Sequence, residues 1–474
     1  MKIIKIIVAI FLMSVTTMSA QQKQPNILFI AIDDLRPQLN AYGLNHMITP
    51  NLDALASEGR LFANHFAQVP TCGPSRAVML TGKNLKSKEE IGHHILGKKL
   101  AKIKKKKDPE TFIHHLKRNG YYTVGMGKIS HSISGSYKNK LELPNSWNAF
   151  LKNKDGYQMY ANGQKRNKKT TPPFEMLEVE DEAYPDGRLA QVAIKELEKR
   201  AKSDKPFFMA VGFLRPHLPF SAPKKYWDLY KREEIPLSPN PEAPTGVAKE
   251  FLHQSGEFFG QYYSPEKGGA GVRISDDYAR QVIHGNFASV SYVDAQVGKV
   301  LDRLKKLKLD KNTIVVVWGD HGWHLGDQTI WGKHSTFENA LKSTMIVKTP
   351  KMEKAGKETK SLIAAVDIYP TLCDLANITK PENLDGKSFA CILKNPKKST
   401  REAVLSYWRD QISMRTDRYR LAVFNDGKKQ ELMLFDHDKD PNETVNIAAT
   451  SPKIIADLLP LLIKMNKGYL PNLK

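Results

Sequence analysis

Cysteine is scarce in this chain, which holds three among its 474 residues: Cys72, Cys373 and Cys391. Three cysteines cannot all pair, so at least one thiol stays free. Cys373 and Cys391 could form a disulfide, although Cys373 lies in an apolar stretch typical of a helix core, where free cysteine is common. Cys72 is then the cysteine whose presence needs an explanation.

Long hydrophobic runs are also missing, since no stretch after the first twenty residues approaches the length of a membrane span. At the N-terminus, Lys2 and Lys5 precede a short apolar run, and small residues follow up to Ala20. A basic start, a short apolar segment and a small residue are typical of a cleaved secretory signal. We therefore predict a signal peptide over residues 1–20, export to the periplasm or the medium, and no insertion into a membrane.

Acidic residues are outnumbered: 50 aspartates and glutamates face 72 lysines and arginines, for a formal net charge of +22. Such a charge attracts polyanions, and by itself it does not distinguish nucleic acid, an anionic membrane and a sulfated polysaccharide. Export narrows this choice, and we expect no nucleic acid as a partner. The lysine-rich segment 98–107 is either a solvated surface or a direct contact for the polyanion.

Strand and helix patterns alternate over most of the chain. Residues 26–32, 206–213 and 313–318 are short apolar runs of the kind that form strands buried on both faces of a parallel sheet. Helical periodicity is clearest over 275–309, where valine and leucine recur at spacings of three and four. The alternation predicts an α/β fold in which helices cover both faces of a large, mostly parallel sheet.

The pattern changes after about residue 395. Short β-type runs now follow one another closely, with turns such as Asn425-Asp426-Gly427, and a helical stretch near 452–465 comes last. The runs span residues 403–408, 412–416, 419–424 and 431–435. We predict a catalytic domain over residues 21–395 and a smaller α+β subdomain with an antiparallel sheet over residues 396–474.

Polar side chains recur where the buried strands end. They are Asp33, Asp34, Lys128, His131, His217, Asp320 and His321, with Lys333 a little further along the chain. Each alone has an ordinary explanation as a surface charge or a buried histidine. Open α/β sheets bind ligands at the carboxyl ends of their strands, so the repeated placement predicts one site. Neighbouring strand residues point oppositely, so Asp33 and Asp34 can face one ion only if the chain turns there.

The segment around Cys72 predicts an anion site. Pro74 favours the first turn of a helix, so Cys72 lies where free backbone N–H groups and the positive end of the helix dipole point outward. Arg76 is one turn further on and can direct its guanidinium toward the same ligand. A buried cysteine ahead of an ordinary helix is the alternative.

The charges around this segment suit two kinds of ligand. The carboxylates of Asp33, Asp34 and Asp320 suit a hard cation such as Ca²⁺ or Mg²⁺. The cationic groups of Arg76, Lys128 and Lys333 suit a tetrahedral oxyanion ester.

The residues from Cys72 to Gly82 resemble the signature of the type I sulfatases, in the alkaline phosphatase-like superfamily. Six more segments resemble that family, most closely its iduronate 2-sulfatase branch. They are Ile32-Asp33-Asp34-Leu35-Arg36, Gly127-Lys128-Ile129-Ser130-His131, Arg215-Pro216-His217-Leu218-Pro219-Phe220, Asp320-His321-Gly322-Trp323, Trp331-Gly332-Lys333-His334-Ser335 and Asp436-His437-Asp438-Lys439-Asp440-Pro441-Asn442-Glu443-Thr444. The similarity covers nearly the whole mature chain.

The resemblance implies that a maturation enzyme oxidises Cys72 to formylglycine. One oxygen of the hydrated aldehyde then attacks sulfur, in a covalent step that divides one hard displacement into two easier ones. The other oxygen binds a single Ca²⁺ ion, together with a set of strand-end residues. By the resemblance these metal ligands are Asp33, Asp34, Asp320 and His321.

The resemblance also implies roles for the basic residues. Arg76 and Lys128 hold the hydrate and the sulfate. His217 and Lys333 bind sulfate oxygens and assist the leaving sugar hydroxyl as a general acid does. His131 is the base that returns the hydrate to the aldehyde and so releases sulfate.

The function that follows is a secreted sulfatase acting on a sulfated polysaccharide or its oligosaccharides, either an algal polymer such as ulvan or a glycosaminoglycan. We expect His324, the Pro- and Gly-rich stretch 236–272 and the C-terminal sheet on the sugar side of the site. Seven other histidines lack such a context and are interpreted as structural or surface residues: His46, His93, His94, His114, His115, His253 and His284.

Two other functions stay open. One is a phosphodiesterase or phosphonate ester hydrolase of the same superfamily. The other is a non-catalytic polysaccharide-binding protein in which Cys72 stays unmodified.

Overall fold

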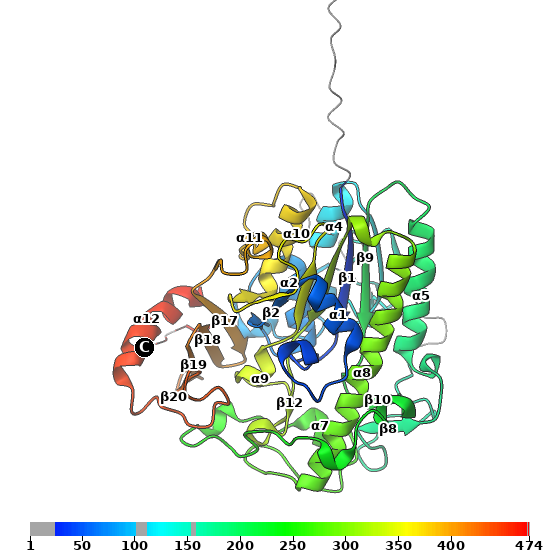
Figure 1. Ribbon diagram of the computed structural model, residues 1–474. Coiled ribbons are helices and arrows are strands. Elements are labelled where there is room, and N and C mark those ends of the chain that lie inside the picture. The colour runs from blue at the N-terminus through cyan, green and yellow to red at the C-terminus, as the bar shows by residue number, and fades with distance from the viewer. Residues whose placement is uncertain (1–23, 101–110, 153–157, 472, 474) are drawn as a thin grey trace, which may run out of the picture.

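The computed structural model describes residues 24–100, 111–152, 158–471 and 473 (Figure 1). The predicted signal peptide and most of the lysine-rich segment 98–107 lie outside these residues. Among the described residues, none of the helices has the length and apolar character needed to cross a membrane. The cysteines Cys72, Cys373 and Cys391 are all free.

A mixed eight-stranded sheet forms the centre of the molecule, in the order β15-β2-β14-β11-β1-β9-β4-β7. In that order the strands span Lys357–Thr359, Arg60–Phe62, Met345–Lys348, Thr313–Gly319, Asn26–Ile32, Phe207–Phe213, Tyr122–Gly127 and Ala149–Leu151. Its pairings are parallel except those of β14 with β11 and β2. The predicted large, mostly parallel sheet is confirmed.

Helices cover both faces of this sheet (Figure 1). Because successive strand residues point to opposite faces, Leu28 and Ile30 of β1 enter one core, while Ile27 and Phe29 enter the other. The first core packs against α1 (Pro50–Glu58), α5 (Pro185–Arg200) and α8 (Asp276–Lys306). The second packs against α2 (Cys72–Thr81), α3 (Ile95–Leu100), α4 (Phe112–Arg118), α10 (Ile368–Ala376) and α11 (Ala390–Lys394).

The predicted C-terminal antiparallel sheet is also confirmed, and with α12 it forms the lobe at the left of Figure 1. Its elements are β17 (Ala403–Trp408), β18 (Gln411–Thr416), β19 (Tyr419–Asn425), β20 (Gln430–Asp436) and α12 (Pro452–Asn466). This lobe shares one hydrophobic core with Phe66, Val69 and Leu341 of the larger part. Packing is therefore continuous between the two, and the boundary at residue 395 stays a prediction.

Small elements complete the fold. Short strands pair as β3 (His65–Phe66) with β16 (Ile363–Ala364), β5 (Ser136–Tyr137) with β6 (Lys140–Leu141), β8 (Phe174–Leu177) with β10 (Phe220–Pro223), and β12 (His324–Leu325) with β13 (Trp331–Gly332). The short helices are α6 (Lys224–Trp227), α7 (Gly256–Gln261) and α9 (Glu338–Leu341).

Helix α7 lies inside the Pro- and Gly-rich stretch 236–272. Phe258 of α7 is fully buried in the core shared with α8, and this contact, which is distant in sequence, fixes the segment.

Candidate active site

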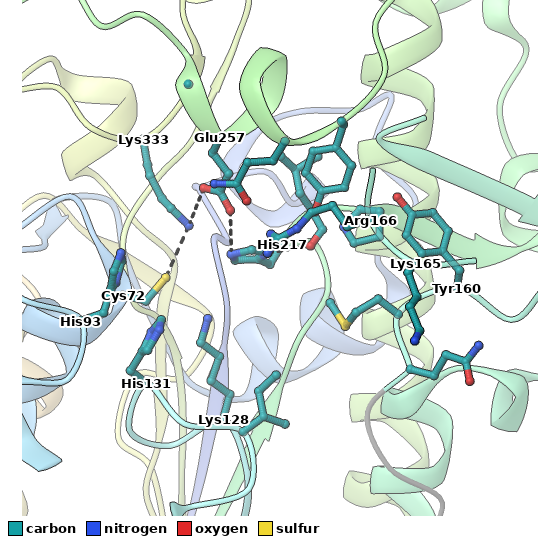
Figure 2. Close-up of a pocket in the computed structure, with 18 of the residues that line it drawn as sticks. Cys72, His93, Lys128, His131, Tyr160, Lys165, Arg166, His217, Glu257 and Lys333 are labelled. Carbon is teal, nitrogen blue, oxygen red and sulfur yellow. Dashed lines mark hydrogen bonds and ion pairs between the residues drawn. The ribbon is translucent and has the colours of Figure 1, made fainter. Parts of the chain in front are cut away.

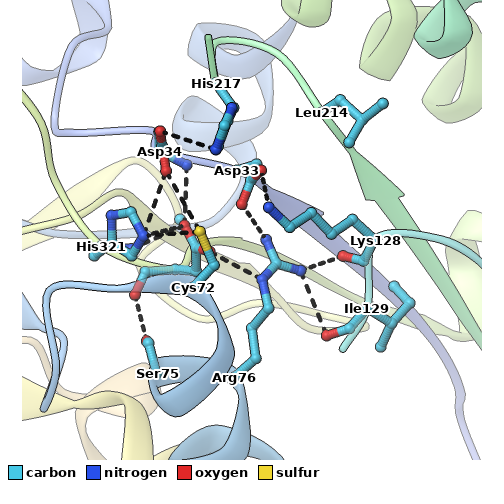
Figure 3. A network of polar contacts seen from close by, with 12 residues as sticks. Asp33, Asp34, Cys72, Ser75, Arg76, Lys128, Ile129, Leu214, His217 and His321 are labelled. Atoms are coloured by element: carbon cyan, nitrogen blue, oxygen red, sulfur yellow. Dashed lines mark hydrogen bonds and ion pairs between the residues drawn. The ribbon is translucent and has the colours of Figure 1, made fainter. Parts of the chain in front are cut away.

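The strand ends of β1 and β11 bring three carboxylates together, as Figure 3 shows for Asp33 and Asp34. The chain does turn after β1, because Asp34 adopts a left-handed conformation with φ of 61°. This turn lets the Asp34 N–H donate a hydrogen bond to Asp320 Oδ1 at 3.0 Å. The three carboxylates therefore lie together at the carboxyl edge of the sheet, where the sequence predicts a site, and they are buried.

Arg76 lies behind these carboxylates. Its guanidinium is fully buried, and it donates to Asp320 Oδ2 at 2.9 Å, to Asp33 Oδ1 at 3.0 Å and to the carbonyl oxygen of Lys128. A buried guanidinium must satisfy its donors, and here protein acceptors do so. The structure therefore directs Arg76 at the metal-ligand candidates rather than at the ligand of Cys72, which differs from the orientation predicted from sequence.

Cys72 is the first residue of α2 and its side chain is buried among cationic groups. Its Sγ atom lies 3.4 Å from Lys333 Nζ and 3.4 Å from His321 Nε2. Although burial raises the pKa of the Cys72 thiol, Lys128, Lys333 and His321 together hold it well below its usual value. The position thus favours a negatively charged group, as its place at a helix N-terminus predicts.

The pKa values of the three carboxylates differ. Although burial raises the pKa of Asp33, Lys128 lies 2.5 Å from its Oδ2, and the nearby cations hold that pKa below the usual range. Burial raises the pKa of Asp34 to about 6, against the opposing effects of His217 and Lys333. Burial also raises the pKa of Asp320. Carboxylates crowded in this way favour an added cation, since repulsion between them is relieved.

His321 has a nitrogen directed at the same point. Its Nδ1 lies 2.9 Å from the carbonyl oxygen of Gly322, which holds the proton on Nδ1 and leaves Nε2 facing Asp34 Oδ1 at 3.3 Å. Although burial lowers the pKa of His321, Asp320 and Asp34 raise it to about 9. Donor atoms of Cys72, Asp320 and His321 lie within 4.8 Å of one another, and so do those of Asp33, Asp34, Cys72 and His217. Three carboxylates with one imidazole fit a hard divalent cation.

Glu257 is a site residue that the sequence did not reveal. It lies on α7, with Oε1 at 3.4 Å from His217 Nε2 and Oε2 at 3.5 Å from Lys333 Nζ. His217 Nε2 is also 3.9 Å from Asp34 Oδ2. Although burial lowers the pKa of His217, Asp34 and Glu257 are among the groups that raise it above its usual value. No spacing or motif singles out Glu257, because α7 reaches the site through tertiary packing.

A cavity of about 1000 Å³ opens above these residues. Figure 2 shows Cys72, His93 and Lys333 at one end and Tyr160 and Lys165 at the other. The stretch 236–272 contributes His253 and residues of α7 to the lining, as expected.

The C-terminal sheet takes a different place from the one predicted. Among the described residues, none of its members lines the cavity, although Trp408 stacks on the cavity residue His334 at 4.6 Å between ring centroids. His324 does not line the cavity either. It is fully buried, with Nε2 at 2.8 Å from Ser335 Oγ, because the β12–β13 pair directs it into the protein.

Two histidines interpreted as structural or surface residues do line the cavity, so that interpretation was wrong for His93 and His253. His93 stacks on His131, with ring centroids 4.5 Å apart. Gly73 is a sequence feature that reflects the position of His93, because a Cβ at Gly73 would lie 2.1 Å from the carbonyl oxygen of His93.

Comparisons with known proteins agree with this geometry. A family model described as sulfatase matches residues 25–378. A second model, described as the C-terminal part of N-sulphoglucosamine sulphohydrolase, matches residues 319–467. The chain is 32% identical to iduronate 2-sulfatase of Homo sapiens over 402 residues, covering 77% of this chain and 71% of the relative. It is 29% identical over 446 residues to a sulfatase of Formosa agariphila, covering 90% and 83%.

Solved structures share the fold. A protein solved with its substrate D-glucosamine-2-N,6-O-disulfate superposes with a TM-score of 0.74 at 23% identity, covering 95% of this chain and 99% of that one. A phosphonate monoester hydrolase from Silicibacter pomeroyi superposes with a TM-score of 0.73 at 22% identity, covering 95% and 96%.

Proposed function

Because this chain belongs to the sulfatase family and is a sulfuric ester hydrolase, we propose that it removes sulfate from the sugars of an anionic polysaccharide or its oligosaccharides. One observation carries this proposal: Cys72 lies among cationic groups at the inner end of a cavity of about 1000 Å³. The family resemblance at 32% identity to an iduronate 2-sulfatase supports a uronate-like sugar. Glycosaminoglycans and algal polymers such as ulvan are both sources of such sugars.

The nucleophile is the group at residue 72. We infer that a maturation enzyme converts Cys72 to formylglycine, and that its hydrated aldehyde supplies the attacking oxygen, for which Sγ stands in here. Lys333 Nζ at 3.4 Å from this position can neutralise the charge of that oxygen. The carboxylates of Asp33, Asp34 and Asp320, with His321, would hold a Ca²⁺ ion, which would supply positive charge to the nucleophile and the sulfate.

The remaining roles fall to groups that line the cavity. Lys128 and Lys333 bind sulfate oxygens, because their ammonium groups lie on either side of Cys72. His217, held between Asp34 and Glu257, is protonated on Nε2 and donates that proton to the leaving sugar oxygen. His131 lies beside Cys72 and helps to lower the pKa of its thiol, and it accepts a proton from the group at residue 72 when sulfate leaves.

The decisive experiment is mass analysis of the peptide containing Cys72, isolated from the native host. The expected mass is that of the aldehyde or its hydrate. A Cys72→Ala variant is expected to lose turnover of sulfate esters while keeping its folded circular dichroism and its calcium binding. An active enzyme that retains an unmodified thiol would falsify this mechanism.

Assays on defined substrates separate the alternatives. Sulfate release from iduronate, glucosamine, galactose and rhamnose sulfates identifies the sugar. Hydrolysis of a phosphonate monoester with no sulfate release supports the phosphonate hydrolase, a function of a protein with the same fold. Binding of sulfated polysaccharide without any turnover supports the non-catalytic function. We also propose export of the protein, which N-terminal sequencing of the secreted form tests.

A further inference from the structure

A basic segment lies at the cavity end remote from Cys72. Lys165, Arg166, Lys168 and Lys169 fall within five residues of an exposed loop. Two of these four, Lys165 and Arg166, line the cavity, whereas Lys168 and Lys169 do not. Figure 2 shows Lys165 on the side opposite Cys72, beside Tyr160. The cavity is therefore cationic at both of its ends.

Arg166 is oriented by an aromatic side chain. Its guanidinium lies over the ring of Tyr262 on the cavity wall, 5.8 Å from the ring centroid. Stacking on an aromatic face orients a guanidinium, and although Arg166 also hydrogen-bonds to Tyr262, a guanidinium carries five N–H donors and can still bind a carboxylate or a sulfate. Among the ion pairs of the described residues, none involves Lys165 or Arg166.

Buried groups hold the loop in place from below. Glu175 accepts the Ala161 N–H at 2.7 Å, and the Tyr160 hydroxyl donates to the Pro172 carbonyl at 2.7 Å. Thr171 Oγ1 donates to the carbonyl oxygen of Lys165 at 2.8 Å. Arg215, two residues before His217, donates to the Met159 carbonyl at 3.0 Å. The backbone that carries Lys165 and Arg166 is thus ordered before any ligand arrives, which lowers the cost of binding.

On the proposed function, the sulfate that is removed binds among Lys128, Lys333 and His217, at the inner end of the cavity. We propose that Lys165 and Arg166 bind a second anionic group, a sulfate or a carboxylate, on the sugar next to the one that loses its sulfate. This inference rests on the proposed function, and it makes the enzyme selective for oligosaccharides with acids on neighbouring sugars. The alternative is that this basic run is only a solvated surface. In that case Lys165 and Arg166 would not differ from Lys168 and Lys169, whereas only the first pair lines the cavity.

Binding measurements on the Cys72→Ala protein test the inference without relying on turnover. The probes are a heparin tetrasaccharide with sulfates and carboxylates, its carboxyl-reduced form with sulfates only, a tetragalacturonate with carboxylates only, and inorganic sulfate. Arg166→Met and Lys165→Met remove the proposed contacts. Lys168→Met and Lys169→Met are matched controls, because they remove the same charge from the same exposed loop outside the cavity.

We expect Arg166→Met to raise the Kd of at least one tetrasaccharide roughly tenfold, as the loss of a charge-assisted hydrogen bond does. The carboxyl-reduced and galacturonate probes then show whether sulfate or carboxylate is bound. Each control variant should change the Kd less than about threefold, in keeping with exposed charges. Equal effects of Arg166→Met and Lys168→Met on the Kd would overturn the inference. It would also be overturned if the protein with Lys165 and Arg166 intact bound none of the tetrasaccharides more tightly than inorganic sulfate. Either result leaves sulfate release at Cys72, tested separately, untouched.

Discussion

Glu257 is a carboxylate inside a cavity that otherwise attracts anions. Although burial raises the pKa of Glu257, Lys333 and His217 lower it to about 2, so the group is ionised at any physiological pH. Its negative charge lies 3.4 Å from His217 Nε2 and stabilises the imidazolium form. Glu257 therefore keeps the proposed acid protonated, and it does so without being a ligand of the cation site.

Replacing this carboxylate should change the pH dependence of the enzyme. Activity that needs protonated His217 is present below the pKa of His217 and is lost as the pH rises through it. Glu257→Gln removes a charge that raises this pKa, so the basic limb of the kcat/KM profile should move to lower pH by about one unit. Glu233→Gln, at an exposed position, is the control. A basic limb that stays in place, or moves to higher pH, contradicts the role of Glu257.

At the scale of elements, the start of α2 depends on a close backbone approach. A Cβ on Gly73 would lie 2.1 Å from the carbonyl oxygen and 2.4 Å from the Cα of His93, and backbone atoms cannot move aside as a flexible side chain can. Gly73 thus sets the distance between the helix that carries Cys72 and the segment whose His93 stacks on His131.

Gly73→Ala should consequently destabilise the protein by about 1–3 kcal/mol, as overpacking does. It should lower kcat, with a smaller change in KM. Urea denaturation and steady-state kinetics measure the two effects. Gly92→Ala is a matched control, because a Cβ at Gly92 meets no atom within 4 Å. The close approach is unimportant if the two variants unfold at the same urea concentration.

Sequence reasoning succeeded where an element carries its own signal. The strands β1, β9 and β11 are continuous apolar runs, and the polar residues after them lie at the site because parallel strands end at one edge. It failed where position depends on packing between distant segments. The local sequences do not determine the antiparallel direction of β14 or the place of Glu257 in the site. Likewise, the inward orientation of His324 results from the pairing of β12 with β13.

At the scale of the whole molecule, a buried ion network joins the C-terminal sheet to the larger part. Arg420 of β19 donates to Glu443 Oε1 at 2.7 Å, to Ser413 Oγ at 2.8 Å and to Glu338 of α9. These three charged side chains are buried or nearly so. Because Arg420 lies between two carboxylates, its removal takes away the cation that they share, although Arg415 remains 3.2 Å from Glu338 Oε2.

Arg420→Met should therefore cost about 3–5 kcal/mol in the free energy of unfolding, the usual penalty for breaking a buried pair. Arg418→Met is the matched control: Arg418 pairs with Asp436, but its side chain is 45% exposed, and such exposed pairs contribute little to stability. Urea unfolding of both variants measures the difference. Similar losses in the two would mean that the network does not hold the lobe.

The same network predicts how stability depends on pH. Although burial raises them, the pKa values of Glu338 and Glu443 lie below 4.5, chiefly because of Arg415 at Glu338 and Arg420 at both carboxylates. Groups with lowered pKa values contribute stability above 4.5 that is lost as the pH falls through the folded values. The stability gap between wild type and Arg420→Met should thus be widest near neutral pH and narrow below about pH 4. A gap that is constant from pH 7 to pH 3 contradicts this.

The catalytic groups come from positions far apart in the chain, and this has a consequence in time. Lys333 lies 3.4 Å from Cys72 Sγ although 261 residues separate them, and β1 pairs with β11 across a similar interval. At the usual rate of synthesis those 261 residues take roughly 10–50 s. During that interval His321 and Lys333, which contact the Cys72 thiol in the folded protein, have not yet been made, whereas in the finished protein Cys72 is 1% exposed. If a maturation enzyme oxidises Cys72, as proposed above, it has to reach the chain before folding buries the thiol, and the rate of folding would then limit the fraction of molecules that become active.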